Sequence, residues 1–233
     1  RIGFPWSRAL LRRTLASVGG TLAATDTVLA DGGISGTLAG GTHHAFHDGG
    51  AGYCVFNDLA IAAMHAIDRG IQRIVVFDVD VHQGDGTASI FADDPRVFTC
   101  SVHGARNFPL RKQTSDLDVA LPDGTGDDAF LAAVADALDR SLDHDPELVL
   151  VQAGVDALDV DRLGRLSVSA DGLYARDRHV LMRLHAAAIP TVLTLGGGYA
   201  EPITHSIGAH VNTYRAARSA LGQASTGGAP GNS

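Results

Sequence analysis

The feature that most constrains the fold of this chain is the alternation of short β-branched apolar runs with longer segments of helical periodicity. Such alternation is typical of repeated βα units, in which a helix connects each strand to a parallel neighbour. We therefore predict an α/β fold, a single domain with a largely parallel central sheet flanked by helices. The expected strands are 36–39, which has the weakest pattern, 74–78, 97–102, 148–153 and 191–195.

The expected helices lie between and after these strands, at 7–30, 58–69, 127–144, 170–187 and 201–221. One apolar stripe at helical spacing is formed by Phe130, Leu131, Val134, Leu138 and Leu142. A chain of 233 residues can bury roughly 70% of its unfolded surface, which favours one domain over 1–221. Gly, Ser, Ala and Pro dominate 222–233, so we expect a disordered tail there.

Composition and charge exclude several classes of protein. The net charge is −8, from 18 basic and 26 acidic residues, and no basic block is present, so nucleic acid is not an expected partner. No apolar run reaches the roughly 20 residues of a membrane helix, and the first ten residues lack the features of a signal peptide. The two cysteines, Cys54 and Cys100, are too few for a disulfide framework. We assign both to packing and expect a reducing cytoplasm.

Polar groups follow four of the expected strands. They are GGTHH after the first, DVDVHQGDG at the end of the second, GVD after LVLVQA, and GGGY after TVLTL. In parallel α/β sheets, ligands bind beyond the carboxyl ends of the strands. The sequence therefore predicts one site built from these four segments.

The segment Asp78 to His82 alternates polar and apolar residues, which places Asp78, Asp80 and His82 on one face of an extended chain. Two carboxylates and an imidazole in a small volume favour a divalent cation, since like charges packed together are otherwise costly. Asp80 and His82 are two candidate ligands, and Asp156 is the best third. Three protein ligands with an open position are typical of catalytic zinc. The alternative interpretation is that the aspartates cap the following helix and His82 fills a corner of the core.

His43 and His44 are adjacent and follow a Gly-Gly turn. Asp78 and Asp85 are free to orient their two rings, because neither is required as a metal ligand. A carboxylate on one ring nitrogen fixes the tautomer and raises the basicity of the other, as a general base requires. The alternative is an exposed histidine pair without a catalytic role.

Tyr199 follows three glycines that allow the backbone to approach a ligand closely. Its hydroxyl is a candidate donor to a developing oxyanion. Taken alone, the motif also fits a simple glycine turn in which Tyr199 packs against the fold.

Four segments in their order along the chain resemble the zinc-dependent histone deacetylase superfamily, which has the arginase/deacetylase fold. They are GGTHHAFHDGGAGYCVFND, VVFDVDVHQGDG, LVQAGVDALDVDRLGRLSVS and LTLGGGY, and the likeness covers most of 38–215. Gln83 and the DRLGRLSVS segment resemble the class IV branch and its bacterial relatives. The family has a preceding segment that adds a strand and part of the active-site rim, so we expect an N-terminally truncated catalytic domain.

The resemblance implies a role for each matching residue. Asp80, His82 and Asp156 would bind zinc. His44, oriented by Asp85, would be the general base and acid. His43, oriented by Asp78, would be an electrostatic partner. Tyr199 would polarise the scissile carbonyl. The resemblance also implies that Tyr53, Phe108 and the Gly52 backbone form the wall of a channel. It further implies a structural potassium ion, bound by Asp78, Ser101 and the backbone of Asp80, His82 and Val102. Tyr53 stands where phenylalanine is usual in the family.

We therefore expect a metal-dependent amidohydrolase that removes acetyl or other acyl groups from lysine side chains of proteins or peptides. Acetylpolyamines or other small amides are the alternative substrates, and an inactive acyl-lysine-binding fragment is the alternative without catalysis. One nitrogen and two oxygen ligands also suit iron(II). The acidic net charge favours a cationic substrate, and the sequence sets no oligomeric state.

Overall fold

The structure is a computed structural model that describes residues 2–222. Six strands occur in this range: β1 (Ile34–Gly36), β2 (Ile74–Asp78), β3 (Val97–Gly104), β4 (Leu117–Leu121), β5 (Leu148–Gln152) and β6 (Thr191–Thr194). They form one sheet in the order β1-β6-β5-β2-β3-β4, and every neighbouring pair is parallel. This sheet confirms the predicted α/β class.

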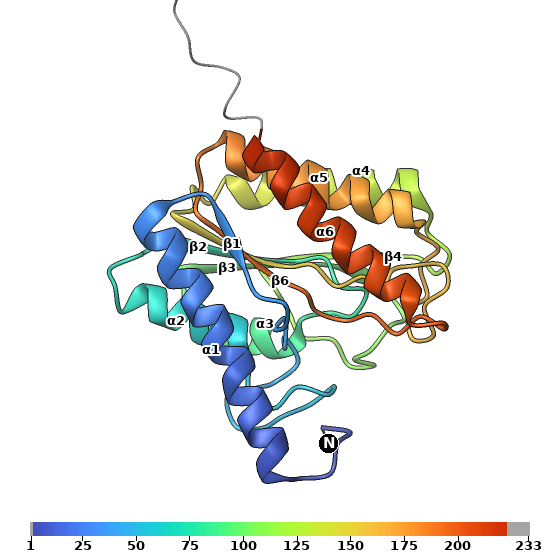
Figure 1. The fold of residues 1–233 in the computed structure, drawn as a ribbon, viewed down its shortest axis with the longest axis horizontal. Helices are drawn as coiled ribbons and strands as arrows, with labels where there is room; N and C mark the ends of the chain where they lie inside the picture. The colour runs from blue at the N-terminus through green and yellow to red at the C-terminus, as the bar shows by residue number, and fades with distance from the viewer. Residues whose placement is uncertain (1, 223–233) are drawn as a thin grey trace, which may run out of the picture.

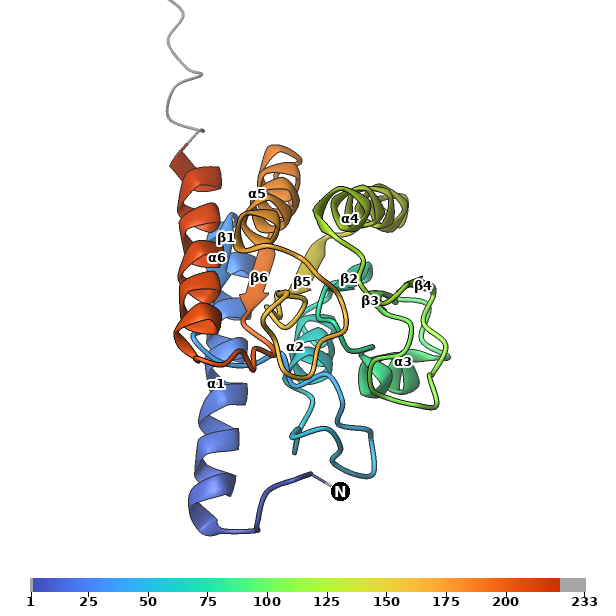
Figure 2. The same ribbon diagram turned by 90° about the vertical axis from the view of Figure 1, so that its right-hand side faces the viewer.

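Helices cover both faces of the sheet (Figure 1; Figure 2). The helices of the described range are α1 (Arg8–Asp31), α2 (Asp58–Ile67), α3 (Asp85–Phe91), α4 (Asp127–Leu142), α5 (Ala170–Ala186) and α6 (Thr204–Gly222). The helices α1, α2 and α3 pack on one face, and α4, α5 and α6 on the other (Figure 1). The result is a three-layer α/β/α arrangement.

The central strands are buried on both faces, which explains their continuous apolar runs. In β2, Val75 and Phe77 belong to the core beneath α4, α5 and α6, whereas Ile74 and Val76 belong to the core beneath α1, α2 and α3. Both cores are made almost entirely of aliphatic side chains and Phe. Burial of these strands fixes their register, and register fixes where the segments after them emerge.

Three elements differ from the sequence prediction. The first strand is Ile34–Gly36 rather than 36–39, and Leu38 is 80% exposed. The helix α3 and the edge strand β4 were not predicted. In β4 exposed residues separate the buried Leu117 and Leu121, a weak signal over five residues, and α3 has only seven residues.

Other expectations concern the ends and the cysteines. The predicted tail at 222–233 lies outside the described residues except for Gly222, which ends α6. Cys54 and Cys100 are buried and free, and burial raises the pKa of each thiol to about 12, as a packing role requires. Among residues 2–222, no helix has the length and apolar character needed to span a membrane.

Candidate active site

The four polar segments follow β1, β6, β5 and β2, which are consecutive strands in the sheet. Because these strands are parallel, their carboxyl ends share one edge, and the segments that leave them meet there. The order of the strands in the sheet therefore places the four polar segments next to one another.

Asp80, His82 and Asp156 come together at this edge, and one ligand atom from each lies within 4.8 Å of the others. The Nδ1 atom of His82 is 3.0 Å from a carboxylate oxygen of Asp80 and 3.0 Å from one of Asp156. All three side chains are buried. Two carboxylates and one imidazole around a common point are a donor set that suits a divalent metal ion such as zinc.

The electrostatics of this cluster favour a cation. Burial and the charge of Asp80 raise the pKa of Asp156 to about 7. The pKa of Asp80 stays well below its ordinary value, since the positive charge of His43 and the hydrogen bond from His82 outweigh the effect of burial. A divalent ion bound between these two buried carboxylates would offset the repulsion between their negative charges.

Further groups orient the candidate ligands. The Nε2 of Gln152 and the backbone N–H of Gly197 donate to Asp80 Oδ2, at 2.8 Å and 3.0 Å. The N–H of Val81 donates to Asp156 Oδ1 at 2.9 Å. Such contacts fix the orientation of metal-binding carboxylates. Gln152 was not singled out in the sequence, although it is the polar residue of an otherwise apolar strand run.

Arg176, in α5, is a second residue that the sequence did not reveal. It is fully buried and donates to the carbonyl oxygens of Val79 and Gly154, at 3.2 Å and 2.7 Å. These carbonyls belong to the two segments that carry the candidate ligands. The Nε of Arg176 also donates to Asp177 Oδ1 at 2.8 Å, which provides a counter-charge. A single guanidinium thus ties the two ligand segments together.

His43 and His44 each receive a carboxylate partner. His43 Nδ1 lies 2.6 Å from Asp78 Oδ2, and His44 Nδ1 lies 2.6 Å from Asp85 Oδ1. In this arrangement Nδ1–H donates to the carboxylate, and Nε2 of each ring is directed away from it. The two rings are 4.1 Å apart between centroids.

The two histidines differ in charge. Burial lowers the pKa of His43, but Asp78 and Asp80 outweigh it and raise that pKa to about 9. Burial and the positive charge of His43 lower the pKa of His44 to about 4. His43 is therefore cationic at neutral pH, and His44 is neutral and able to accept a proton at Nε2.

The loop that carries the two histidines is held by Asp58, the first residue of α2. Its carboxylate is fully buried and accepts hydrogen bonds from the backbone N–H groups of Gly41 and Thr42, at 3.1 Å and 2.7 Å. The hydroxyls of Thr21 and Thr42 donate to the same carboxylate, each at 2.6 Å. Asp58 was also missed in the sequence, where it reads as an ordinary acidic residue in a first helical turn.

A cavity of about 640 Å³ opens over His44 and His82 and is lined by Gly52, Tyr53, Phe108 and other residues. The ring of Phe108 meets that of His44 edge to face, with 4.8 Å between centroids. Gly52 has a φ of +49°, and a Cβ there would collide with the His44 ring, so only glycine fits. All three predicted wall residues thus line this cavity.

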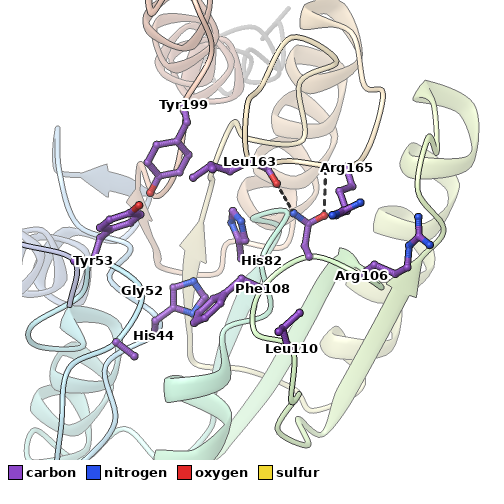
Figure 3. Close-up of a pocket in the computed structure, with 13 residues that line it drawn as sticks. His44, Gly52, Tyr53, His82, Arg106, Phe108, Leu110, Leu163, Arg165 and Tyr199 are labelled. Carbon is purple, nitrogen blue, oxygen red and sulfur yellow. Dashed lines mark hydrogen bonds between the residues drawn. The ribbon is translucent and has the colours of Figure 1, made fainter. Parts of the chain in front are cut away.

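Tyr199 lies on the side of this cavity opposite Phe108, and its hydroxyl points toward that of Tyr53 (Figure 3). The two ring centroids are 6.1 Å apart. Burial and the nearby carboxylates of Asp80 and Asp156 raise the pKa of Tyr199. The phenol therefore stays protonated and can act only as a hydrogen-bond donor to an anionic oxygen.

Asp78 and Ser101, the side chains implied for potassium, are direct neighbours on β2 and β3. Both are buried, and the Ser101 Oγ lies 3.0 Å from His103 Nδ1. Their oxygen atoms are the donor type that hard cations take. The structure thus places the two predicted potassium side chains next to each other.

Comparison with known proteins gives consistent matches. The histone deacetylase domain, as a protein family, matches residues 3–214. The chain is 49% identical over 220 residues to an uncharacterised protein of Picosynechococcus, covering 94% of the chain and 73% of that protein. It is 34% identical to histone deacetylase 2 of Arabidopsis thaliana, over 78% of the chain and 48% of the relative. It is 32% identical to the acetoin utilization protein AcuC of Bacillus subtilis, over 78% of the chain and 51% of the relative.

The fold is similar to a solved structure of an acetylpolyamine aminohydrolase from Burkholderia pseudomallei. The TM-score is 0.75 and the sequence identity 28%, over 90% of the chain and 63% of the other protein. The chain therefore spans about half the length of the Arabidopsis and Bacillus relatives and somewhat more of the Burkholderia enzyme.

Proposed function

The chain belongs to the histone deacetylase family, and from that premise we propose that it is a zinc-dependent amidohydrolase that removes acyl groups from lysine side chains of proteins or peptides. One observation carries the proposal: His44, held by Asp85 through Nδ1 at 2.6 Å, has its ring centroid 6.0 Å from that of His82 in the Asp80, His82 and Asp156 cluster. A base next to a metal-binding set is what hydrolysis of an amide by water requires.

Asp80, His82 and Asp156 are the residues that would hold zinc. When bound, zinc supplies Lewis acidity, which polarises the acyl carbonyl and makes a water molecule more acidic. Iron(II) is a second candidate for the same one-nitrogen, two-oxygen donor set. Asp78 and Ser101 would contribute to a separate structural potassium site.

Proton transfer is assigned to His44. Its Nε2 accepts the proton of the attacking water, while Asp85 holds the Nδ1–H 2.6 Å away and fixes the tautomer. The protonated ring then donates the same proton to the nitrogen of the leaving amine. His43, whose pKa is raised to about 9, keeps a positive charge beside the reacting centre and opposes premature protonation of His44.

Charge on the acyl oxygen is stabilised by Tyr199. Its hydroxyl remains protonated, because burial raises its pKa, and it donates to the oxygen as negative charge develops. Tyr53 and Phe108 would line the channel for the acyl-lysine chain, and the Gly52 backbone would be a contact in the same wall. An aromatic channel excludes water around the aliphatic stem of the substrate.

An acetylpolyamine is the second candidate substrate, because the Burkholderia acetylpolyamine aminohydrolase covers 90% of the chain. A non-catalytic acyl-lysine-binding role is less well supported, since His43, His44 and Tyr199 are all present. The two buried thiols fit a reducing cytoplasm, and the 49% identical Picosynechococcus protein supports a bacterial source.

The test is release of free amine from an acetyl-lysine peptide and from acetylspermidine by the zinc-loaded chain. We expect hydrolysis of the peptide, inhibition by a hydroxamate, and loss of activity in His44→Ala. The exposed His47 offers a matched control, and His47→Ala should retain the activity. Absence of hydrolysis by folded, zinc-loaded protein would contradict the proposal, and faster hydrolysis of acetylspermidine would transfer the substrate assignment to polyamines.

A further inference from the structure

The charged side chains at the mouth of the cavity have the opposite sign to the chain as a whole. The chain carries a net charge of −8. The cavity over His44 and His82 is lined by Arg106 and Arg165, and no aspartate or glutamate is among its lining residues in the described part of the chain. In Figure 3 both arginines lie at the side of the cavity opposite Tyr53 and Tyr199. A substrate therefore meets positive charge at this side of the mouth, whereas the buried carboxylates of Asp80 and Asp156 line the adjoining pocket behind His44 and His82.

One carboxylate is shared by these two arginines. Asp123 Oδ2 accepts hydrogen bonds from the guanidinium of Arg106, and lies 3.4 Å from Nη1 of Arg165. The group of three therefore keeps a net charge of +1. The Arg106 side chain is 72% exposed and that of Arg165 is 53% exposed, whereas Asp123 is 26% exposed. The cationic groups, rather than the carboxylate, are presented to solvent at the mouth.

Backbone hydrogen bonds hold together the segments that carry the two arginines. The buried Asn107 donates from Nδ2 to the carbonyl of Leu163 at 2.8 Å and accepts from the N–H of Arg165 at 3.2 Å. The N–H of Gly124 donates to the Arg165 carbonyl at 2.7 Å. The three segments that carry Arg106, Asp123 and Arg165 are thus joined to one another. A preorganised cationic edge loses less entropy on binding than independent side chains would.

Exposed apolar side chains lie beside this edge. Leu110 is 95% exposed, and Phe108 and Leu163 are each more than 40% exposed, although all three line the cavity. The residues that flank an acyl-lysine in a peptide would lie against these side chains, and so would the distal ammonium groups of an acetylated polyamine. Apolar contacts next to arginines fit a peptide segment that carries both an acidic and an apolar side chain.

On the basis of the proposed amidohydrolase function, we propose that Arg106 and Arg165 select acyl-lysine peptides with an aspartate or glutamate next to the acylated lysine, and disfavour cationic polyamines. A guanidinium pairs with a carboxylate through two parallel hydrogen bonds. The ammonium groups of a polyamine would instead be repelled at the same edge. Like-charge contacts at a binding surface oppose the wrong partner.

The experiment measures kcat/KM for acetyl-lysine peptides that differ only in the residue on each side of the lysine: aspartate, glutamine or lysine. An exposed ion pair is worth a factor of about two to five. Aspartate and lysine differ by two units of charge, so we expect their exchange at one flanking position to change kcat/KM by roughly 4- to 25-fold in favour of aspartate, and at both positions by more. Acetylspermidine should be the poorest substrate. Added salt should reduce the ratio, because it screens exposed charges.

Variants test whether the preference for the aspartate peptide depends on Arg106 and Arg165. Arg165→Gln and Arg106→Gln should each reduce the ratio of aspartate to lysine peptide, and Asp123→Asn should increase it. Arg140, at the far end of α4, does not line the cavity, and Arg140→Gln is the matched control for net charge, with an unchanged ratio. Equal rates for the three peptides, a preference for the lysine peptide or acetylspermidine, or a ratio insensitive to both arginines would overturn the inference.

Binding of the same fluorescent peptides, measured by anisotropy, separates this inference from the proposed function. If no substrate is hydrolysed, the amidohydrolase assignment is wrong, and the order of the dissociation constants still decides the charge preference. Tighter binding of the aspartate peptide supports the inference, and an order that is flat or reversed contradicts it.

Discussion

Replacing Asp58 with asparagine should destabilise the fold and disturb the histidine loop. The Asp58 carboxylate has no exposure, and each of its oxygens accepts one backbone N–H and one threonine hydroxyl. Oδ2 accepts from the Gly41 N–H and the Thr21 hydroxyl, and Oδ1 accepts from both the N–H and the hydroxyl of Thr42. In asparagine one of these oxygens becomes an NH₂ group, which cannot accept.

The magnitude follows from that geometry. A threonine hydroxyl can turn and accept from the new NH₂ group, but a backbone N–H cannot. Whichever way the amide is turned, the N–H of either Gly41 or Thr42 is left without an acceptor. A buried unsatisfied donor costs about 1–3 kcal/mol. For a domain of this size, that corresponds to a decrease in Tm of roughly 2–12 °C.

The assay is urea and thermal unfolding of Asp58→Asn, with kcat on an acetyl-lysine peptide as a second readout. Asp128 lies in the first turn of α4 and is exposed, so Asp128→Asn matches the charge change and the helix-dipole effect without the buried contacts. We expect the control to stay within about 0.5 kcal/mol of the wild type. The reasoning is refuted if the free energy of unfolding of Asp58→Asn also stays within about 0.5 kcal/mol of the wild type.

Four further predictions address the site and the fold. Tyr199→Phe should reduce kcat by about 10²- to 10³-fold with unchanged metal content in elemental analysis; loss of metal would contradict the role of Tyr199. Asp156→Ala should fail to retain metal after dialysis, and one metal ion per chain would remove Asp156 from the ligand set. Arg176→Met should lower the free energy of unfolding by about 3–5 kcal/mol, since it leaves the buried Asp177 unpaired; a loss below 1 kcal/mol in urea would be inconsistent with this account. Glu147 accepts hydrogen bonds from two backbone N–H groups, which lower its pKa. The ionised carboxylate therefore stabilises the fold above the unfolded pKa of roughly 4.3, and this stabilisation is lost as the pH falls through the folded pKa. The free energies of unfolding of wild type and Glu147→Gln should differ at pH 7 and converge in acid, and a difference that persists in acid would refute this prediction.

The parallel sheet could be predicted because its central strands are buried on both faces. β2 and β5 are buried at every position, so each reads in the sequence as an unbroken apolar run. β4 lies at the edge of the sheet and has two exposed residues among five, which breaks that signal. The helix α3 begins inside the Gly-Asp-Gly motif and ends after seven residues, too short for a helical period to be recognised.

The main residues of the site could be predicted because chemistry at strand ends has a local sequence signature. The strand β2 ends at Asp78, and the chain turns after it, yet Asp80 and His82 still meet Asp156 as the period of two suggested. The supporting contacts have no such signature. Gln152 reaches Asp80 across 72 positions, and Arg176 reaches Val79 across 97.

Only the folded chain brings such pairs together. An arginine within a helix reads as a solvent-facing charge, whereas Arg176 is fully buried. The arginines of the cavity mouth were missed for a related reason. Arg106 and Arg165 belong to separate loops, and the Asp123 carboxylate that joins them lies on a third.

The most direct test of the account is amide hydrolysis measured during a zinc titration of the metal-free chain. We expect no release of amine from an acetyl-lysine peptide before zinc is added, a linear rise in rate, and a plateau at one zinc per chain. The same titration with Asp156→Ala should stay flat. Hydrolysis that is independent of metal, or a folded chain that binds one zinc ion and still releases no amine, would contradict the assignment of this site.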